Sequence, residues 1–526
     1  MRFLVRFIVL SLVLTSVVTK AQNRWQKIYH DDIDAPGEYI LETYDHGYLL
    51  LGRHGANYPN YSWLIKTDIN GDILWEKTIG DGMNPFVLLE MEQNNNGSIY
   101  FCGQYNNKDP QGNPIIIKLD SCGNKLWCKE IHIEDNHDFA NCITACSDGG
   151  IAVTLNYTGI TSLVDRICLT KIQSNGYLSW TMCYNSSDSC LRAEDDYNLI
   201  VTPDNGFLIS GFCYYEDPNH PNLYWPEPYY IKVDSLGNFE WETIALKEDP
   251  IQGGVAWHTI LSPDSLYFYS SISHYYYKDN TSSPAILKMN MNGEIIDIYD
   301  LAFPDEYGKL FQSVFISDSI LAGSAVWGAD PESTPKAVIF DTLGTILDSA
   351  FLLDNDYLSY VRKTFDNKLL FFTELYEEEI EQFDSYLFKL NLNLFSDTIY
   401  NSYFQYDTLC PYPIASDTIA LDDCELIVGI EEEAENWGKG EEESEVFVLY
   451  PNPATDHINC RLSVVGCRLS MFIYDMFGRR IEEIVVPDGQ QEMTIDLSSY
   501  FQGIYIAVLK DATGIIGRKK FVVARP

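Results

Sequence analysis

Few side chains in this 526-residue chain are spaced for catalysis or metal binding. Cys142 and Cys146 have the spacing of half a zinc site, but no second pair of cysteine or histidine residues lies near them in sequence. The segment 68–72, Asp-Ile-Asn-Gly-Asp, resembles the start of a calcium loop whose later oxygen ligands are missing, so a hairpin turn explains it better. The histidines are scattered, and no Gly-x-Ser-x-Gly segment or phosphate-binding loop is present. We therefore predict no catalytic, metal or cofactor residue.

An aromatic segment, residues 213–230, is the best candidate for binding a ligand. Its tyrosine and tryptophan rings stand beside Asn, Asp and Glu, a composition that binds sugars by stacking and hydrogen bonding. Residues 273–277 occupy the matching place one repeat later. The alternative is that these loops pack on one another. The predicted ligand-binding residues are Tyr214, Tyr215, Tyr224, Trp225, Tyr229 and Tyr276.

The chain has 13 cysteines, an odd number that suggests disulfides in an exported protein. We predict that Cys410 pairs with Cys424, since both lie in one short tail. We also predict that Cys122 pairs with Cys128 across a hairpin. Spacing alone does not determine connectivity, so other pairings stay open.

A repeat organises the middle of the chain and would position all of these residues. Apolar, β-branched stretches lead into Asp-x-x-Gly or a close variant, and a second stretch often carries Trp. The turn glycines stand 51 to 61 residues apart, at positions 71, 123, 176, 237, 293 and 344. A degenerate last copy covers residues 388–394. Glycine permits the tight hairpin turn, and aspartate can accept hydrogen bonds from its backbone.

Each repeat has room for four strands, which is the size of a propeller blade. We therefore predict an all-β fold, with a seven-bladed β-propeller in residues 22–401. Residues 25–29 look like the last strand of a blade and are predicted to close the ring on the final blade. Eight segments look like last strands, so eight blades stay an alternative. Trp75, Trp127, Trp180 and Trp241 are predicted to pack between blades.

The last 81 residues read as a small antiparallel β-sandwich with alternating apolar residues. Three motifs occur in order: Tyr-Pro-Asn-Pro-Ala at 450–454, Tyr-Asp-Met-Phe-Gly-Arg at 474–479, and Gly-Ile-Tyr at 503–505. This series resembles the type A C-terminal sorting domain of the type IX secretion system of Gram-negative bacteria. The motif residues are Tyr450, Pro451, Asn452, Pro453, Asp475, Gly478, Arg479, Gly503 and Tyr505. The resemblance implies outer-membrane export, partnership with the secretion machinery and a sorting protease, and release or attachment at the cell surface.

The N-terminus is consistent with export. A basic start, an apolar run over residues 7–18 and a small-x-small site before residue 22 predict a signal peptide in residues 1–21, leading to the periplasm. Residues 402–430 are predicted to be a cysteine-containing β tail with two short strands, at 407–411 and 417–424. Residues 431–445 are predicted to be an acidic linker, and residues 446–526 the sorting domain.

The formal net charge is −41, and most of it lies in residues 22–430. Nucleic acid binding depends on Lys and Arg that neutralise phosphates, so we expect no nucleic acid partner. The charge is better explained as a device for solubility.

Two classes of function remain. The first is a secreted or surface module that binds a polysaccharide or a protein without catalysis. The second is an enzyme with its site at the central channel, acting on polysaccharide or using a quinone. The repeat resembles the quinoprotein blade, which implies the quinone-dependent dehydrogenase, but the adjacent cysteines often used in such enzymes are absent. We therefore favour the binding module.

Deleting residues 446–526 should leave the protein in the periplasm, because the recognisable sorting motifs lie there. Fractionation of cells that express the truncated and the full chain measures this. Normal surface or medium levels of the truncated chain would contradict the assignment.

Overall fold

The computed structural model describes residues 25–29, 36–54, 61–80, 82, 84–106, 112–132, 139–158, 165–184, 190–216, 224–246, 252–302, 307–328, 334–352, 359–377, 382–395, 397, 399–400, 404–421, 423–428, 432–433, 447–452, 454–462, 469–475, 480–487, 490, 492–510 and 515–525. The chain divides into two compact units, Met1–Gly176 with Trp180–Glu435 and Tyr177–Ser179 with Asn436–Pro526. The predicted signal peptide lies outside the described residues. None of the described segments is a helix with the length and apolarity to cross a membrane.

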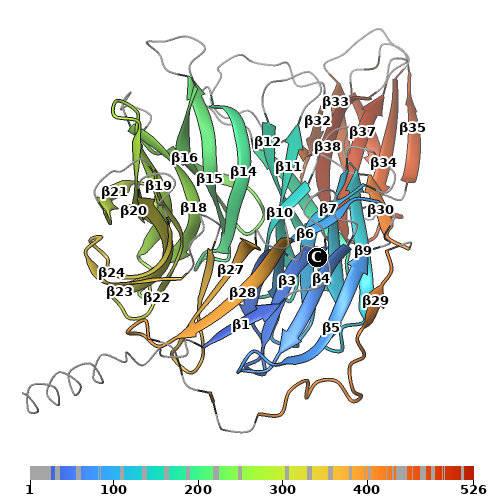
Figure 1. The fold of residues 1–526 in the computed structure, drawn as a ribbon. Coiled ribbons are helices and arrows are strands. Elements are labelled where there is room, and N and C mark those ends of the chain that lie inside the picture. The colour runs from blue at the N-terminus through green and yellow to red at the C-terminus, as the bar shows by residue number, and fades with distance from the viewer. Residues whose placement is uncertain are drawn as a thin grey trace, which may run out of the picture. The chain divides into compact units, whose positions relative to one another are not determined.

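The first unit is built from four-stranded antiparallel sheets that follow one another along the chain (Figure 1). Each sheet is here called a blade. Blade 1 is β2 (Gly37–Glu42), β3 (Tyr48–His54), β4 (Tyr61–Thr67) and β5 (Ile73–Gly80). Blade 2 is β6 (Phe86–Gln93), β7 (Ile99–Tyr105), β8 (Asn113–Leu119) and β9 (Lys125–His132). Blade 3 is β10 (Phe139–Ala145), β11 (Ile151–Thr158), β12 (Asp165–Ile172) and β13 (Leu178–Tyr184).

The remaining blades repeat this order. Blade 4 is β14 (Cys190–Val201), β15 (Phe207–Glu216), β16 (Tyr224–Val233) and β17 (Phe239–Ile244). Blade 5 is β18 (Gln252–Leu261), β19 (Tyr267–Tyr276), β20 (Thr281–Asn290) and β21 (Ile295–Asp300). Blade 6 is β22 (Tyr307–Phe315), β23 (Ile320–Gly328), β24 (Thr334–Asp341) and β25 (Ile346–Phe351). Blade 7 is β26 (Ser359–Lys363), β27 (Leu369–Glu377), β28 (Gln382–Leu390) and β1 (Gln26–Tyr29).

The sheets are joined into a ring by their first strands. β2, β6, β10, β14, β18, β22 and β26 contact one another in that order, and β26 also contacts β2. β1 pairs with β28 in register Gln26 with Phe388, so the N-terminal strand completes the last blade as predicted. The all-β, blade-like architecture is confirmed. The count of seven stays a prediction, which this order of contacts among the described residues supports.

The repeated turn forms as its sequence requires. In blade 1, Asp68 Oδ1 accepts the backbone N–H groups of Asn70 and Asp72 at 2.8 Å, and Gly71 N–H donates to the Asp68 carbonyl. Asp120, Asp234 and Asp341 make the same bonds in their own turns. The aspartate is therefore a turn residue, and its carboxylate already has two partners in the hairpin.

A buried lysine in the third strand supports a second turn at the same end of several blades. Lys66 Nζ lies 2.5 Å from Asp45 Oδ1, and both side chains are almost fully buried. Lys171 and Asp148, Lys232 and Asp204, and Lys389 and Asp366 form equivalent ion pairs. A buried charge needs such a partner, so each pair links the third strand to the turn between the first two strands of its own blade.

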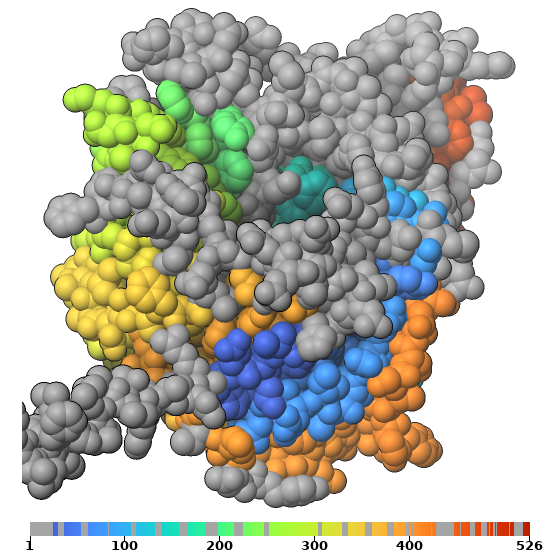
Figure 2. Space-filling view, in the orientation of Figure 1, coloured from blue at the N-terminus to red at the C-terminus, as the bar shows by residue number. Residues whose placement is uncertain are grey.

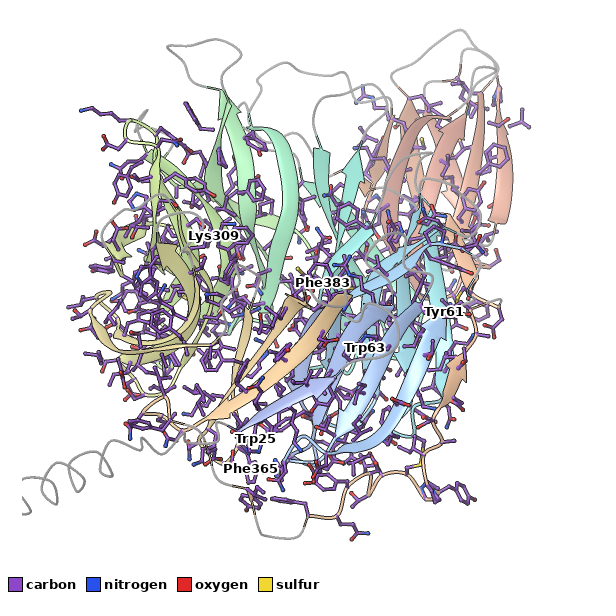
Figure 3. All side chains as sticks on the ribbon, viewed as in Figure 1. Trp25, Tyr61, Trp63, Lys309, Phe365 and Phe383 are labelled. Carbon is purple, nitrogen blue, oxygen red and sulfur yellow. A yellow bond between two sulfur atoms is a disulfide. The ribbon has the colours of Figure 1, made fainter. Side chains whose placement is uncertain are left out.

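Tryptophans of the last strands pack on the turn glycines of the next blade. A Cβ atom added to Gly176 would lie 3.1 Å from the Trp127 ring, and φ at Gly176 is +88°. The same contact joins Trp180 to Gly237 and Trp241 to Gly293. The predicted packing between blades is confirmed for these three. Trp25, which precedes β1, lies against Gly71 and extends the pattern across the ring closure (Figure 3).

The tail after blade 7 is a strap, residues 404–433, that adds fifth strands to blades 1, 2 and 3. β29 (Asp417–Ile419) pairs in parallel with β5, β30 (Glu425–Val428) with β9, and β31 (Glu432–Glu433) with β13. Figure 2 shows the strap in orange along the rim, beside the blue strands of blade 1. One expectation was wrong, since residues 407–411 form no strand. β31 lies near the start of the expected linker, and the linker itself stays a prediction.

The strap also corrects the disulfide pairing. Cys122 is bonded to Cys410, and Cys128 to Cys424, so the predicted pairs Cys410–Cys424 and Cys122–Cys128 are wrong although the four residues are right. The strap runs alongside blade 2 and brings one strap cysteine to each blade cysteine, with Cα–Cα distances of 5.1 and 4.8 Å. A third disulfide, Cys168–Cys183, joins β12 to β13.

The second unit contains two small antiparallel sheets. One has the order β32 (Phe447–Tyr450), β33 (His457–Leu462), β36 (Glu492–Asp496), and the other β35 (Arg480–Val486), β34 (Leu469–Asp475), β37 (Gly503–Lys510), β38 (Ile515–Val523). One apolar cluster contains residues of both sheets, among them Phe447, Ile458, Ile473 and Phe521. This is the sandwich that the alternating pattern predicted.

Replacing Trp127 with Ala should lower the free energy of unfolding by about 2 kcal/mol, because it removes the ring that covers the turn of blade 3. Denaturant melts measure this. The control is Leu126→Ala at a side chain that is 55% exposed, which should change little. Equal effects of the two substitutions would contradict the docking role.

Candidate functional site

The first strands place one side chain from each blade at a common level. In each blade this residue lies four positions before the residue whose backbone N–H makes the first hydrogen bond of the next hairpin turn. In blade 1, for example, Tyr39 lies four positions before Thr43. All seven line one cavity of about 410 Å³, called here the channel. They are Tyr39, Glu90, Cys142, Asn198, His258, Gln312 and Tyr360. A volume of this size suits a small molecule or part of a larger one.

A second level lies one residue earlier in the same strands. Its members that line the channel are Glu38, Leu89, Asn141, Trp257 and Phe311. In six blades the pairing of the first and second strands shifts close to these two levels. Such bulges redirect side chains, and here consecutive residues can line the same space.

Three polar side chains of the first level hold the next blade. Glu90 Oε2 accepts the N–H of Ile143 at 2.7 Å, and Asn198 Oδ1 accepts the N–H of Thr259 at 2.9 Å. Gln312 Oε1 accepts the N–H of Val361 at 3.3 Å. These bonds join blade 2 to 3, 4 to 5 and 6 to 7, so these residues have a structural role as well as a place in the channel wall.

Glu90 is an acid that titrates near neutral pH. Burial raises its pKa to about 7, and the bonds from Ile143 N–H and the Tyr39 hydroxyl and the charge of Arg362 oppose the rise. Burial also raises the pKa of Glu92 to about 7, and repulsion from Glu90 adds to the rise. Near pH 7 these carboxyl groups exchange protons readily, so they can donate or accept a hydrogen bond.

A second acidic group lies in blades 1 and 7. Glu38 forms an ion pair with Arg53, and burial raises the pKa of the Glu38 carboxyl against the effect of that guanidinium. Burial raises the pKa of Glu374 to about 7, and the Glu38 charge contributes. His258 is the opposite case, because burial lowers its pKa to about 3, so the imidazole is neutral at physiological pH.

The predicted aromatic residues do not form an open platform. Tyr229 is a core residue, 4% exposed, with its hydroxyl donating to Glu242 Oε2 at 2.9 Å, and its assignment to ligand binding stays a prediction. The Trp225 ring is stacked on Tyr277 at 3.9 Å between centroids, and Tyr214 packs edge-on against Phe212. The side chains of Tyr215 and Tyr224 lie outside those that the structure describes.

Tyr276 belongs to a polar cluster in blade 5. Its hydroxyl donates to Asp300, whose other oxygen lies 2.9 Å from Nδ1 of His274. His274 is 5% exposed. The structure thus gives Tyr276 a packing and hydrogen-bonding role, and ligand binding by Tyr214, Tyr215, Tyr224, Trp225 and Tyr276 stays a prediction.

Most of the sorting motif residues that the structure describes have local structural roles. Asn452 donates from Nδ2 to the Lys520 carbonyl and accepts the Val522 N–H, which holds the last strand β38. Tyr505 is buried, and its hydroxyl donates to the Phe501 carbonyl. Tyr450 ends β32 and is followed by Pro451, Asp475 ends β34 opposite Tyr505, and Gly503 begins β37. Pro453, Gly478 and Arg479 lie outside the described residues.

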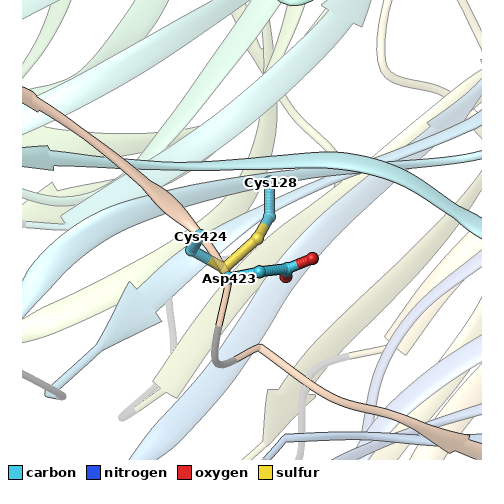
Figure 4. Close-up of side chains that lie close together, drawn as sticks. All are labelled: Cys128, Asp423 and Cys424. Carbon is cyan, nitrogen blue, oxygen red and sulfur yellow. A yellow bond between two sulfur atoms is a disulfide. The ribbon is translucent and has the colours of Figure 1, made fainter.

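One cluster among the described residues has the spacing of metal ligands, namely Cys128, Asp423 and Cys424. The two sulfur atoms are bonded to each other in the disulfide (Figure 4), so no thiolate is available. Cys142 and Cys146 take no part in a disulfide, and burial raises the pKa of the Cys146 thiol to about 11. A buried thiol of this kind is a poor metal ligand at neutral pH.

The channel residues were missed from the sequence because no motif marks them. The available signal is a fixed offset from the hairpin turn of each repeat, which identifies Glu90, Asn198 and Gln312 once the blades are aligned. The aromatic insert drew attention instead, since its composition is unusual.

Comparison with known proteins identifies the C-terminal unit. Residues 448–524 match the family described as secretion system C-terminal sorting domain. The chain carries a type IX sorting domain. This domain indicates export through the type IX secretion system, contact with that machinery, and a final location at the cell surface or in the medium.

The first unit has only distant similarities. No curated protein matches the chain in sequence. A protein of unknown function from Bacteroides caccae aligns at 11% identity with a TM-score of 0.37, covering 58% of this chain and 94% of that one. The polysaccharide lyase Uly1 aligns at 11% identity with a TM-score of 0.45, covering 69% and 91%. A post-proline cleaving enzyme from Rickettsia typhi aligns at 9% identity with a TM-score of 0.35, covering 69% and 51%. Similarities this low carry no argument about function.

Replacing Glu90 with Gln should stabilise the protein at pH 8 and have little effect at pH 5. A carboxyl whose pKa is higher in the folded than in the unfolded state gives its full contribution to stability below the unfolded pKa of about 4.5. This contribution to stability is lost as the pH rises through the folded pKa of about 7. The difference at pH 8 can reach about 3 kcal/mol. Glu90 is faced by other titratable or charged groups, namely Tyr39, Cys142, Glu92 and Arg362. Wild type and variant are therefore compared with each other at each pH, so that the contributions of these groups cancel.

Thermal melts of both proteins at the two pH values measure this effect, with the exposed Glu76→Gln as control. A gain of the same size at both pH values would show that Glu90 is not a buried acid of this kind.

Proposed function

We propose that this protein is an exported binding protein for extracellular glycan, that the channel is its ligand site, and that it does not catalyse a reaction. We further propose that the N-terminal signal peptide takes it to the periplasm, and that the sorting protease removes the C-terminal domain after export. The type IX sorting domain supports exposure to extracellular polymers. A protein ligand is the alternative within this class.

The observation that carries the proposal is the mixed lining of the channel. Aromatic rings of Tyr39, Trp257, Phe311 and Tyr360 share the wall with the amides of Asn141 and other residues. Sugars present apolar ring faces and many hydroxyl groups, and a wall with both kinds of surface can satisfy both. The start of β16 in blade 4, with Tyr224 and Trp225, is called here the rim of blade 4 and is proposed as a second contact.

Binding can be tested with the purified full chain by affinity electrophoresis in gels that contain different extracellular polysaccharides. We expect retention in at least one gel, and a tenfold or greater loss for Trp257→Ala. Tyr224→Ala with Trp225→Ala tests the rim, and Trp241→Phe is a control outside the channel. If only the Tyr224 and Trp225 substitutions reduce retention, the ligand site lies at the rim of blade 4 and not in the channel. If no glycan retains the protein, the proposal is contradicted.

A glycan-cleaving enzyme is the second candidate, and Glu90 favours it. A carboxyl with a pKa of about 7 that lines a cavity is suited to general acid–base catalysis near neutral pH. Release of new sugar ends by the wild type, abolished in Glu90→Gln while binding remains, would support this candidate over the binding module. The quinone-dependent alternative has no observation in its favour among the described residues.

A further inference from the structure

We propose that the channel selects neutral, hydroxyl-rich sugars over anionic ones, with Asn141 and His258 as the hydrogen-bonding residues and Trp257 as the stacking surface. This inference rests on the proposed function and adds the charge class of the ligand and its contacts. It follows from a comparison of two sets of polar and charged groups in the channel wall: those that already have a partner within the protein, and those that a ligand could bind.

Besides Glu38 Oε1, which forms an ion pair with Arg53, two polar groups of the channel wall find no hydrogen-bond partner among the described residues. They are Nδ2 of Asn141, whose side chain is only 9% exposed, and Nδ1 of His258. Both residues line the cavity, one from blade 3 and one from blade 5. A buried polar group without a partner is costly, so each is completed by something that enters the channel.

These groups suit hydroxyl partners. The Asn141 amide nitrogen can only donate, whereas a neutral imidazole has one donor and one acceptor nitrogen. The imidazole of His258 is neutral because burial lowers its pKa to about 3. A hydroxyl group can both donate and accept, so one sugar ring can serve Asn141 and His258 together.

Trp257 provides the apolar part of the site. Its Nε1 donates to Ser273 Oγ at 2.7 Å, so the indole is fixed in orientation and presents only its ring. Phe311 packs edge-on against it at 5.6 Å between centroids. A fixed aromatic ring next to two free polar groups is the arrangement that stacks one face of a sugar and binds its edge.

The charges of the lining disfavour an anion. Glu38 and Glu90 line the channel, and no lysine or arginine is among the described lining residues. The nearest guanidinium groups are occupied, since Arg53 pairs with Glu38 and Arg362 donates to Gln312 at 2.7 Å. A carboxylate or sulfate that entered would meet acidic groups without a free cation, and like charges in a partly buried site repel strongly.

Among the side chains that the structure describes, Lys309 is a nearby cation that offers an alternative (Figure 3). Its Nζ lies 5.2 Å from the centroid of the Trp257 ring and 5.8 Å from that of Phe311. If the ligand were an anionic sugar, this ammonium group would have to bind it. Under the present proposal Lys309 supports the aromatic rings by cation–π contacts instead.

Isothermal titration calorimetry of the purified full chain tests the inference with matched oligosaccharides that differ in charge. Three pairs are suitable: methyl-esterified and free oligogalacturonides, linear and glucuronate-substituted xylo-oligosaccharides, and desulfated and sulfated galactan oligosaccharides. We expect at least one neutral member to bind at least tenfold more tightly than its anionic partner. The ratio should grow from pH 6 to pH 7.5, because Glu90 in the channel wall and its neighbour Glu92 lose protons over this range.

Variants assign the contacts. Asn141→Leu keeps the size of the side chain and should weaken binding of the neutral sugar about tenfold, the effect of one lost hydrogen bond. Asn292→Leu, at an exposed turn outside the channel, is the matched control and should have no effect. Lys309→Met should leave the preference for the neutral member unchanged. Melting curves for each variant show whether it is folded.

Three results would overturn the inference: an anionic member that binds as tightly as its neutral partner, loss of binding of an anion in Lys309→Met, or no effect of Asn141→Leu in a folded protein. If the full chain is retained by a polysaccharide gel but shows none of this selectivity, only the inference fails. If no glycan binds in either experiment, the proposed function fails with it.

Discussion

Closure of the ring of blades is the constraint on which the rest of the structure depends. Seven first strands contact one another in cyclic order among the described residues, and β1 returns from the N-terminal end to complete the sheet of β26, β27 and β28. An open ring would expose sheet edges and spread the first strands apart. The channel would then be lost, because each of its two levels takes side chains from several blades. The small segment Gln26–Tyr29 is therefore as important for the site as any residue that lines it.

Neighbouring blades are joined by different kinds of interaction at three distances from the channel. Near the channel, side-chain oxygens of one blade accept backbone N–H groups of the next, as Glu90 does for Ile143. At the outer strands, tryptophan rings cover turn glycines. Outside blades 1 to 3 the strap adds a strand to each blade, and Lys77 and Lys129 form ion pairs with its acidic residues. The innermost bonds are the ones that make the channel wall rigid, because they fix residues that also line it.

The sequence was a good guide wherever the information is local or repeated. The Asp-x-x-Gly turns, the strands on either side of them, the docking tryptophans and the strand at residues 25–29 follow from hydrophobic alternation and turn chemistry. The buried pairs such as Lys66 with Asp45 could have been found, since both residues recur at fixed places in several repeats.

Information that depends on distant segments could not be predicted. The strap cysteines meet partners 288 and 296 residues earlier in the chain, and cysteine spacing contains nothing about the path of the strap. The channel is similar, because no motif marks Glu90, His258 and Gln312, and their common offset from the hairpin turns becomes informative only once the blades are aligned. The aromatic insert is conspicuous in sequence because of its composition, which does not show what its rings contact. Trp225 stacks on Tyr277 of blade 5, and Tyr229 is buried.

The path of the strap also determines where mechanical load enters the propeller. The sorting domain follows β31 in the chain, so any tension applied to that domain would reach β31 first, then β30 and the Cys128–Cys424 bond, then β29 and the Cys122–Cys410 bond. Covalent anchors on blade 2 thus stand between the force and the last blade. The ring closure at β1 and β28, which no disulfide protects among the described residues, is shielded from a tension that would otherwise pull directly on the end of β28.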